Sequence, residues 1–251
     1  MTFARESFIV FRRQVRMNLR NPAWVFIGVM QQVLYLVLFG PLLKPLVGDF
    51  GADNAYTFLV PGLLVQLGMF GAFFAGFGLI GEWREGVIEG ERVTPASRTA
   101  LLVGRLSRDV AQLFVQALIL VTLGYVMGMR SPVEGVVIGV LLTLLVGGAC
   151  AAASNALALT TKSEDVMAPV INMVMMPVLL LSGILLPMTL GPDWLQRVSD
   201  FMPFRWIVDG VRDTFLGDFA TSDVMWGTTW TIALFGLALW WGTAVFRKEN
   251  A

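Results

Sequence analysis

The sequence of 251 residues contains no histidine and only one cysteine, Cys150. Without histidine, the chain lacks the commonest general base and metal ligand of proteins. A single cysteine supports neither a disulfide framework nor a zinc site, and its place in a run of small apolar residues predicts a packing role. Charge is also scarce, at 14% of residues, and the formal net charge is zero. A neutral chain gives no support for nucleic-acid binding.

Nucleotide-binding and proton-relay signatures are missing as well. No G-x-x-x-x-G-K-[ST] loop and no Gly-Lys pair occur in the chain, so ATP binding by that route is not expected. The apolar segments show neither paired carboxylates nor an obvious ion relay, which an ion-coupled carrier generally carries. We therefore predict no catalytic residue, cofactor site or metal site in this chain. Any transport must then draw its energy from outside the chain.

What the sequence does have is apolar length. Hydrophobic residues make up 56% of the chain and the mean hydropathy is +0.72, whereas a soluble domain is about 45–50% apolar and about 25% charged. Segments of about 20 apolar residues are long enough to span a bilayer. We predict an all-α integral membrane protein with six transmembrane helices, at about 23–43, 56–80, 101–129, 132–159, 166–186 and 224–246.

Residues 2–20 predict an amphipathic helix that lies in the membrane surface. On a helical projection Phe8, Phe11, Val15 and Leu19 share one face, and five arginines cluster beside it. This pattern is typical of interfacial helices; the alternative is an ordinary solvated helix. The segment does not resemble a signal peptide, so we expect the chain to be inserted whole.

The distribution of basic residues predicts the orientation. With six spans, both termini lie on one side, and thirteen of the eighteen lysines and arginines fall on that side. Because excess basic residues mark the cytoplasmic face, we predict cytoplasmic termini. Residues 82–98 are then also cytoplasmic, and residues 188–216 lie outside.

Several spans carry amides and aromatic residues that suggest a substrate path. Glutamines and asparagines inside spans usually bond neighbouring helices, and an aromatic stripe is also explained by lipid or helix packing. Contact with a passing hydrophobic substrate is the alternative. The candidates are Gln31, Gln66, Phe70, Phe73, Phe74, Phe77 and Asn172; further mid-span amides are Gln32, Gln112, Gln116 and Asn155.

The longest charged interruption between two spans is residues 81–98, with four glutamates and three arginines. Glu82, Glu85 and Glu89 recur at three and four residues, which places them on one face if the segment is a single helix. Such a face suits basic groups on a partner, although a merely solvated face is the alternative. A second polar turn, 160–165, precedes the fifth span.

Four motifs in order along the chain resemble those of ABC-2-type exporter permeases, in particular the daunorubicin-resistance-like drug permeases. They are Tyr56 to Gly62, the E-x-x-x-G-x-x-E and Thr-Pro-x-Ser-Arg stretch of 82–98, Ser182-Gly183 with Pro187, and Pro192-Asp193-Trp194-Leu195. Gly90-Glu91 departs from the pattern, because many relatives have a leucine pair there, so packing against an ATPase could differ in detail.

The resemblance implies the ABC-2 permease fold, as a single transmembrane domain over 1–251 with re-entrant extracellular helices in 188–216. A plain extracellular loop is the alternative for 188–216. The implied ATPase-coupling residues are Glu82, Glu85, Gly86, Glu89, Thr94, Pro95, Ser97, Arg98, Ser163, Glu164 and Asp165. The implied extracellular gate comprises Ser182, Gly183, Pro187, Trp194 and Pro203.

The resemblance also implies a function and partners. The chain would be the permease of an ATP-driven exporter of a hydrophobic drug-like molecule or lipid, in the cell membrane. It would pair with a second, identical permease and two copies of a separate ATPase, which would hold ATP and Mg²⁺. The alternatives are an ABC-2 permease for polysaccharide or lipid-linked glycan, and an ion-coupled carrier or membrane-embedded enzyme.

Overall fold

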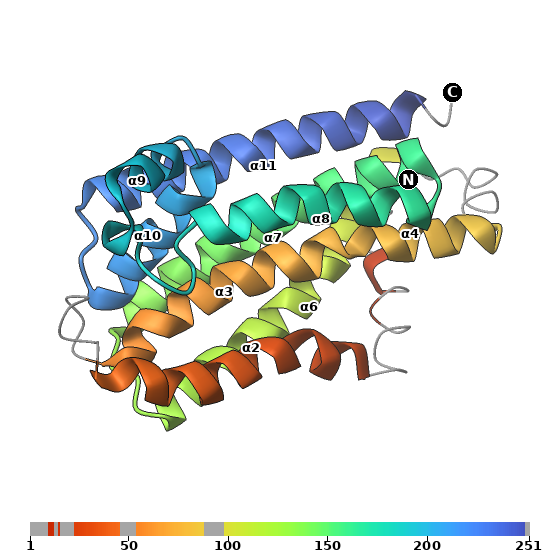
Figure 1. Ribbon diagram of the computed structural model, residues 1–251. Helices are drawn as coiled ribbons and strands as arrows, with labels where there is room; N and C mark the ends of the chain where they lie inside the picture. Colours follow the sequence, from red (N-terminus) through yellow and green to blue (C-terminus); the bar gives the residue numbers. More distant parts are fainter. Residues whose placement is uncertain (1–9, 13–14, 16–22, 46–53, 88–97, 249–251) are drawn as a thin grey trace.

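The computed structural model describes residues 10–12, 15, 23–45, 54–87 and 98–248. These residues form a helical bundle (Figure 1), and no strand occurs among them. The predicted interfacial helix lies almost wholly outside the described residues. The helices are α2 (Ala23–Leu43), α3 (Ala55–Phe73), α4 (Ala75–Arg84), α6 (Arg98–Val126), α7 (Val133–Thr161), α8 (Glu164–Leu181), the 3₁₀ turn η2 (Met188–Leu190), α9 (Asp193–Asp200), α10 (Pro203–Leu216) and α11 (Ser222–Lys248).

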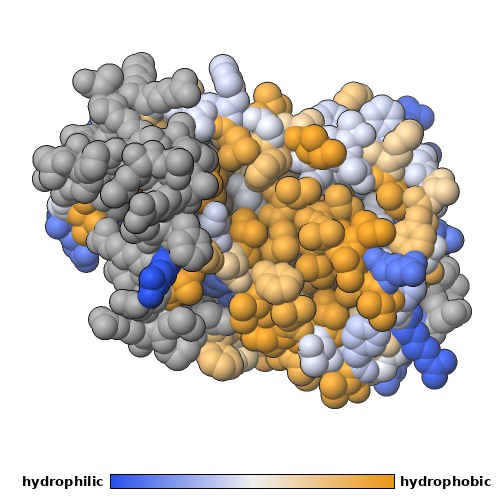
Figure 2. Space-filling model, turned by 180° about the vertical axis from the view of Figure 1, so that it is seen from behind, coloured by the Kyte–Doolittle hydropathy of each residue, from blue (hydrophilic) through white to orange (hydrophobic). Residues whose placement is uncertain are grey.

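Six stretches of these helices are long and apolar enough to cross a membrane. Large apolar side chains point outward from them: Met173 is 82% exposed and Trp240 is 71% exposed. Figure 2 shows one face of the molecule as a broad hydrophobic area with hydrophilic groups toward its edges. A surface of this kind is unfavourable in water and suits lipid. The predicted all-α, six-span membrane architecture is therefore confirmed.

Helix α7 lies at the centre of the bundle and touches α3, α4, α6, α8, α10 and α11. Its small residues permit this crowding. A Cβ added at Gly135 would lie 1.8 Å from the carbonyl oxygen of Thr214, so only glycine fits there. The close neighbour of Gly135 and Gly139 is α10, however, and not another spanning helix. Cys150 is buried in this central helix.

Two predicted span boundaries need correction. The second span is two helices, α3 and α4, which break at Phe74. The fifth span ends at Leu181 rather than at residue 186, because Gly183 has φ +71° and turns the chain. Pro169 and Pro177, which predict kinks, both lie inside α8 without interrupting it.

The ends of the bundle differ in character. One end carries the start of α2, the end of α4, the α7–α8 turn and the end of α11; the other carries α9 and α10 (Figure 1). At the α9–α10 end, Asn54 caps α3 by accepting from the Tyr56 amide at 2.9 Å, and its Nδ2 donates to the Gly128 carbonyl at 2.6 Å. Thr57 accepts from the Arg130 amide at 3.1 Å. These bonds tie α3 to the α6–α7 turn.

Helices α9 and α10 are the two amphipathic pieces that the sequence predicts on either side of residue 203. The predicted apolar face of α10 is fully buried at Ile207, Val208, Val211 and Phe215. It packs between α3, α7 and α11. In α9, by contrast, Trp194 is 66% exposed. Residues 188–216 are thus built into the bundle through α10.

Candidate functional sites at the two ends of the bundle

A cluster of four charges joins α4 to α6. Arg105 Nη2 lies 2.7 Å from Glu82 Oε2, and Arg108 Nη1 lies 3.8 Å from Glu82 Oε1. Arg108 also donates from Nε and Nη2 to Asp109 Oδ1, at 2.9 and 2.7 Å. The Arg105 side chain is only 3% exposed. Because buried charges are costly unless paired, this cluster fixes the position of α4 against α6.

A second set of contacts joins α4 to the α7–α8 turn. Arg84 Nη1 lies 3.0 Å from Glu164 Oε1. The Nζ atom of Lys162 stands 5.5 Å from the centre of the Trp83 ring, within the range of a cation–π interaction. Lys162 itself is left-handed, with φ +52°, and ends α7. Two segments that the sequence assigns to coupling therefore touch in the fold.

The structure describes seven of the predicted coupling residues, and the others lie outside the described residues. Glu82 is turned toward arginines of its own chain, whereas Glu85 is exposed and Gly86 has φ +73°. Glu164 pairs with Arg84, and Ser163 and Asp165 flank it at the start of α8. Arg98 begins α6. The other members lie outside the described residues: Glu89, Thr94, Pro95 and Ser97.

The single helical face predicted for Glu82, Glu85 and Glu89 does not form. Helix α4 ends at Arg84, with Glu85 as its C-cap and Gly86 left-handed. Glycine is the residue that adopts this conformation without steric cost. The helix that carries Glu82 therefore stops before Glu89, and only Glu85 of the pair Glu82 and Glu85 is presented outward.

The break between α3 and α4 is held by a hydroxyl group of α7. Ser154 Oγ donates to the Phe73 carbonyl at 2.5 Å and accepts from the Gly76 amide at 3.0 Å. These are backbone groups that the interrupted helix leaves without their usual partners. Sequence reasoning missed this site. The available signals were the glycines at 71, 76 and 78 and the serine in the small-residue run of α7.

At the opposite end, Arg212 is the centre of the cap that α10 forms with the turn after α8. Its Nη2 donates to the carbonyls of Gly183 and Ile184, at 2.7 and 2.8 Å, and its guanidinium carbon lies 4.1 Å from the Phe58 ring centre. The residue is 6% exposed. One side chain thus joins α10, the turn after α8 and the start of α3. The sequence places Arg212 on the polar face of α10, and nothing in its spacing predicts this burial.

Gly62 lets the turn after α8 approach α3. A Cβ at Gly62 would lie 2.4 Å from the Ile184 carbonyl oxygen and 3.3 Å from Arg212 Nη2. Two predicted motifs, Tyr56 to Gly62 and Ser182 to Pro187, therefore meet Arg212 of α10 at one point. This convergence is a property of the fold that no one motif indicates.

The charges around Arg212 are only partly compensated. Burial lowers the pKa of Arg212 to about 10, so the guanidinium remains charged at neutral pH. Asp209 Oδ1 accepts from Arg212 Nη1 at 3.3 Å. Burial raises the pKa of Asp209 from its usual value, while Arg212 and Arg205 oppose that shift. Burial also raises the pKa of Asp213, whose Oδ2 accepts a 2.6 Å hydrogen bond from Thr221.

Some of the predicted gate residues lie at the Arg212 contacts and others lie apart from them. Ser182 is fully buried and bonds the Leu179 carbonyl at 3.2 Å, and Gly183 supplies a carbonyl to Arg212. Pro187 precedes η2, and Pro203 is the first residue of α10. Trp194 is exposed in α9 and stands apart from the Arg212 contacts.

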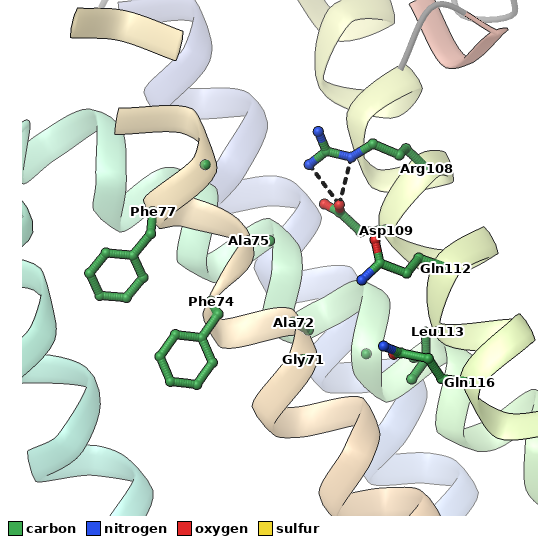
Figure 3. Close-up of a pocket in the computed structure, with 12 residues that line it drawn as sticks. Gly71, Ala72, Phe74, Ala75, Phe77, Arg108, Asp109, Gln112, Leu113 and Gln116 are labelled. Carbon is green, nitrogen blue, oxygen red and sulfur yellow. Dashed lines mark hydrogen bonds and ion pairs between the residues drawn. The ribbon is translucent and has the colours of Figure 1, made fainter. Parts of the chain in front are cut away.

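The predicted substrate-path residues are not gathered into one site. Phe74 and Phe77 stack with ring centres 5.7 Å apart and line a cavity between α4 and α6 (Figure 3). Phe73 lines a smaller cavity with Phe204, and Phe70 is half-buried against the core. Gln66 is fully buried, while Gln31 and Asn172 make local bonds to Tyr35 and Ala168. The amides that line the cavity with Phe74 are Gln112 and Gln116.

Six apolar spans, one of them a central helix rich in small residues, with charges clustered at one end and a helical cap at the other, define a multi-pass helical membrane protein. Comparison with known families agrees with this class and refines it. A family model described as ABC-2 type transporter matches residues 5–216, and the chain belongs to that family.

Similar proteins are transport permeases by name. The chain is 29% identical over 198 residues to "Putative transport permease ycf38" of Porphyra purpurea, covering 77% of this chain and 68% of the relative. It is 27% identical over 191 residues to "Inner membrane transport permease YadH" of Escherichia coli, covering 75% and 74%. It is 24% identical over 198 residues to "Probable multidrug ABC transporter permease YbhR" of Escherichia coli, covering 76% and 52%.

Proposed function

We propose that this chain is the membrane-spanning permease of an ATP-driven exporter that moves a hydrophobic drug-like or lipid substrate out of the cell. Membership of the ABC-2 family supports the transport role. A multidrug substrate is named for one relative only, YbhR, and is extended here to this chain as part of the proposal. The proposed location of the chain is the cell membrane, with both termini cytoplasmic.

The observation that carries the proposal is the contact between the end of α4 and the α7–α8 turn. The Arg84–Glu164 ion pair and the Lys162–Trp83 contact link these two segments, and the Glu82 cluster links α4 to α6. A push on this end would move α4, α6 and the start of α8 together. The break at Phe74 is the point where α4 could tilt relative to α3.

The force would come from a partner. We propose two copies of a separate ABC ATPase, holding ATP and Mg²⁺, and a second permease identical to this one. The whole chain would form one ABC-2 domain, with 82–98 as the coupling segment. At the far end, export would require the cap around Arg212 to loosen, because α10 is locked to α3 and to the turn after α8.

Charge reversal at the exposed coupling residue tests the proposal. In proteoliposomes containing the permease and its ATPase, Glu85→Lys should abolish ATP-dependent export or release the ATPase during purification. Glu134→Lys reverses an equally exposed glutamate at the other end of the bundle and serves as the control. Undiminished export by Glu85→Lys would count against coupling through this end.

Two further measurements separate the alternatives. ATP hydrolysis stimulated by hydrophobic compounds rather than by glycan precursors would distinguish a drug or lipid exporter from a glycan exporter. Transport by the purified chain alone, driven by an ion gradient without any ATPase, would favour an ion-coupled carrier and overturn the exporter proposal.

A further inference from the structure

A cavity of about 440 Å³ lies between α3–α4 and α6, with α7 behind it. Its volume falls within the range of about 300–1,000 Å³ that is typical of small-molecule sites. Arg108, Asp109, Gln112 and Gln116 line it from α6, while Gly71 and Gly78 line it from the facing helices. Figure 3 shows the four α6 side chains on one side of the site and the rings of Phe74 and Phe77 directed away from them.

Small residues keep this space open. A Cβ added at Gly78 would meet no atom within 4 Å, and one at Gly71 would reach only Gln116 Oε1, at 4.0 Å. A larger residue would be accommodated at either position without a clash. Both glycines are exposed, so their missing side chains leave this side of the cavity open.

The polar wall of the cavity is neutral but carries both signs of charge. Arg108 and Asp109 line it as an ion pair, and the adjoining Arg105–Glu82 pair cancels in the same way. Two of the three guanidinium nitrogens of Arg108, Nε and Nη2, converge on Asp109 Oδ1, and the buried Oδ2 accepts no hydrogen bond within the described part of the chain. A modest rotation of the carboxylate would present that second oxygen to a donor.

This charge arrangement selects among ligands. A ligand with net charge would enter a poorly hydrated space without a compensating charge, which is costly. A zwitterion brings an anion for the Arg108 guanidinium and a cation for the Asp109 carboxylate, and each charge is then paired. The two glutamines add donors and acceptors for the polar groups between them.

The position of the cavity along α6 indicates an amphiphile. The apolar stretch Leu101–Val126 is about 39 Å long at about 1.5 Å per residue, against a hydrocarbon core of about 30 Å. Asp109 lies about 12 Å from its Leu101 end, which places it in the outer part of the hydrocarbon core, on the headgroup side of its middle. Gln112, Leu113 and Gln116 follow at increasing depth, with Leu113 as an apolar wall.

We propose that this cavity binds the headgroup and upper chain of a zwitterionic amphiphile, of the chemistry of a phosphate joined to an ammonium group. The leaflet that supplies it, the inner one, rests on the function proposed above. Binding itself requires neither ATP nor the ATPase. A failed binding test therefore leaves the exporter proposal standing, and a failed export test leaves the binding result intact.

The test uses the full-length chain in nanodiscs that contain equal amounts of phosphatidylethanolamine and phosphatidylglycerol with identical acyl chains. After extraction, native mass spectrometry counts the lipids retained per chain. The wild type should retain phosphatidylethanolamine at least about tenfold over phosphatidylglycerol, a ratio that corresponds to about 1.4 kcal/mol. Equal retention of the two lipids, or preference for the anionic one, would overturn the proposal.

Two variants test the site independently. Asp109→Asn removes the nearer of the two acids that pair with Arg108 and should shift the preference toward phosphatidylglycerol, whereas Glu134→Gln at the far end of the bundle should not. Gly78→Leu should fill the cavity and lower retention about tenfold. Gly236→Leu, at another helical position where a Cβ meets nothing within 4 Å, is its control. Unchanged retention in Gly78→Leu, with an unchanged unfolding temperature, would place the lipid elsewhere.

A tail-free competitor separates an amphiphile from a water-soluble zwitterion. Glycerophosphoethanolamine carries the same headgroup without acyl chains. It should fail to displace the retained lipid, because the apolar part of the cavity contributes to binding. Complete displacement at low millimolar concentration would show that the site recognises a soluble zwitterion, and the amphiphile assignment would be wrong.

Discussion

Replacing Arg212 by glutamine should loosen the cap at the α9–α10 end of the bundle. The variant loses two charge-assisted hydrogen bonds, to Gly183 and Ile184, and the contact with the Phe58 ring. Each such bond contributes about 1.5–3 kcal/mol, and a desolvated cation–π contact about 2 kcal/mol. The variant no longer has to bury a charge, and the free energy saved in this way offsets much of the loss.

The expected net loss in the free energy of unfolding is about 3 kcal/mol, at the lower end of the range for breaking a buried charged contact. For a chain of this length, that corresponds to a fall of roughly 6–12 °C in the unfolding temperature. Arg212→Lys should lose roughly half as much, because an ammonium retains the charge but lacks the planar fork and ring stacking of a guanidinium.

Thermal unfolding of the purified protein in detergent measures the fall in the unfolding temperature. Hydrogen exchange of the amides in residues 182–186 measures the loosening of the turn after α8, since this turn should open more often in Arg212→Gln. Arg197→Gln is the matched control, because it removes the same side chain from an exposed position in the neighbouring helix α9. If Arg212→Gln and Arg197→Gln unfold within about 1 kcal/mol of each other, a magnitude usual for surface changes, Arg212 does not hold the cap.

Three further predictions concern the helix junctions. Ser154→Ala leaves the Phe73 carbonyl and Gly76 amide without their partner and should cost about 2–4 kcal/mol in unfolding experiments; Ser107→Ala, which loses only an exposed bond within its own helix, should cost less than about 1 kcal/mol. Gly135→Ala forces a Cβ against Thr214; the strain should cost about 1–3 kcal/mol and so lower the unfolding temperature. Gly236→Ala should raise the unfolding temperature slightly through helix propensity. Glu82→Gln removes the carboxylate beside buried Arg105 and should cost about 3–5 kcal/mol, but Glu164→Gln, in an exposed pair, at most about 1 kcal/mol; equal losses from these two glutamates would contradict the burial argument.

Hydropathy was sufficient to predict the six spanning segments and the class of protein. A helix of the first span has the predicted bounds, 23–43, and α9 and α10 begin and end close to the predicted pieces on either side of Pro203. The apolar face of α10 was also predictable, since Ile207, Val211 and Phe215 recur at helical spacing. These features depend on local periodicity and on length, which a sequence states directly.

Features that depend on a partner distant in the chain were not predictable. The break at Phe74 has no proline to signal it; it is held by Ser154, 80 positions further on. The glutamate face in 82–98 was predicted as one helix, but Gly86 interrupts it, and Glu82 turns inward to Arg105. The substrate-path residues were chosen by type, and only Phe74 and Phe77 line the larger cavity.

The sequence by itself determined that this chain spans a membrane, roughly where its six spans lie and which segments interrupt them, because the length and apolarity of a segment decide its preference for lipid over water. Only the tertiary structure decided that Arg212 is buried, that the α4 end meets the α7–α8 turn, and that Arg108 and Asp109 face a cavity. Those outcomes depend on which helices pack together, and in lipid that choice follows from small residues and paired polar groups on different helices, whose pairing no local pattern records.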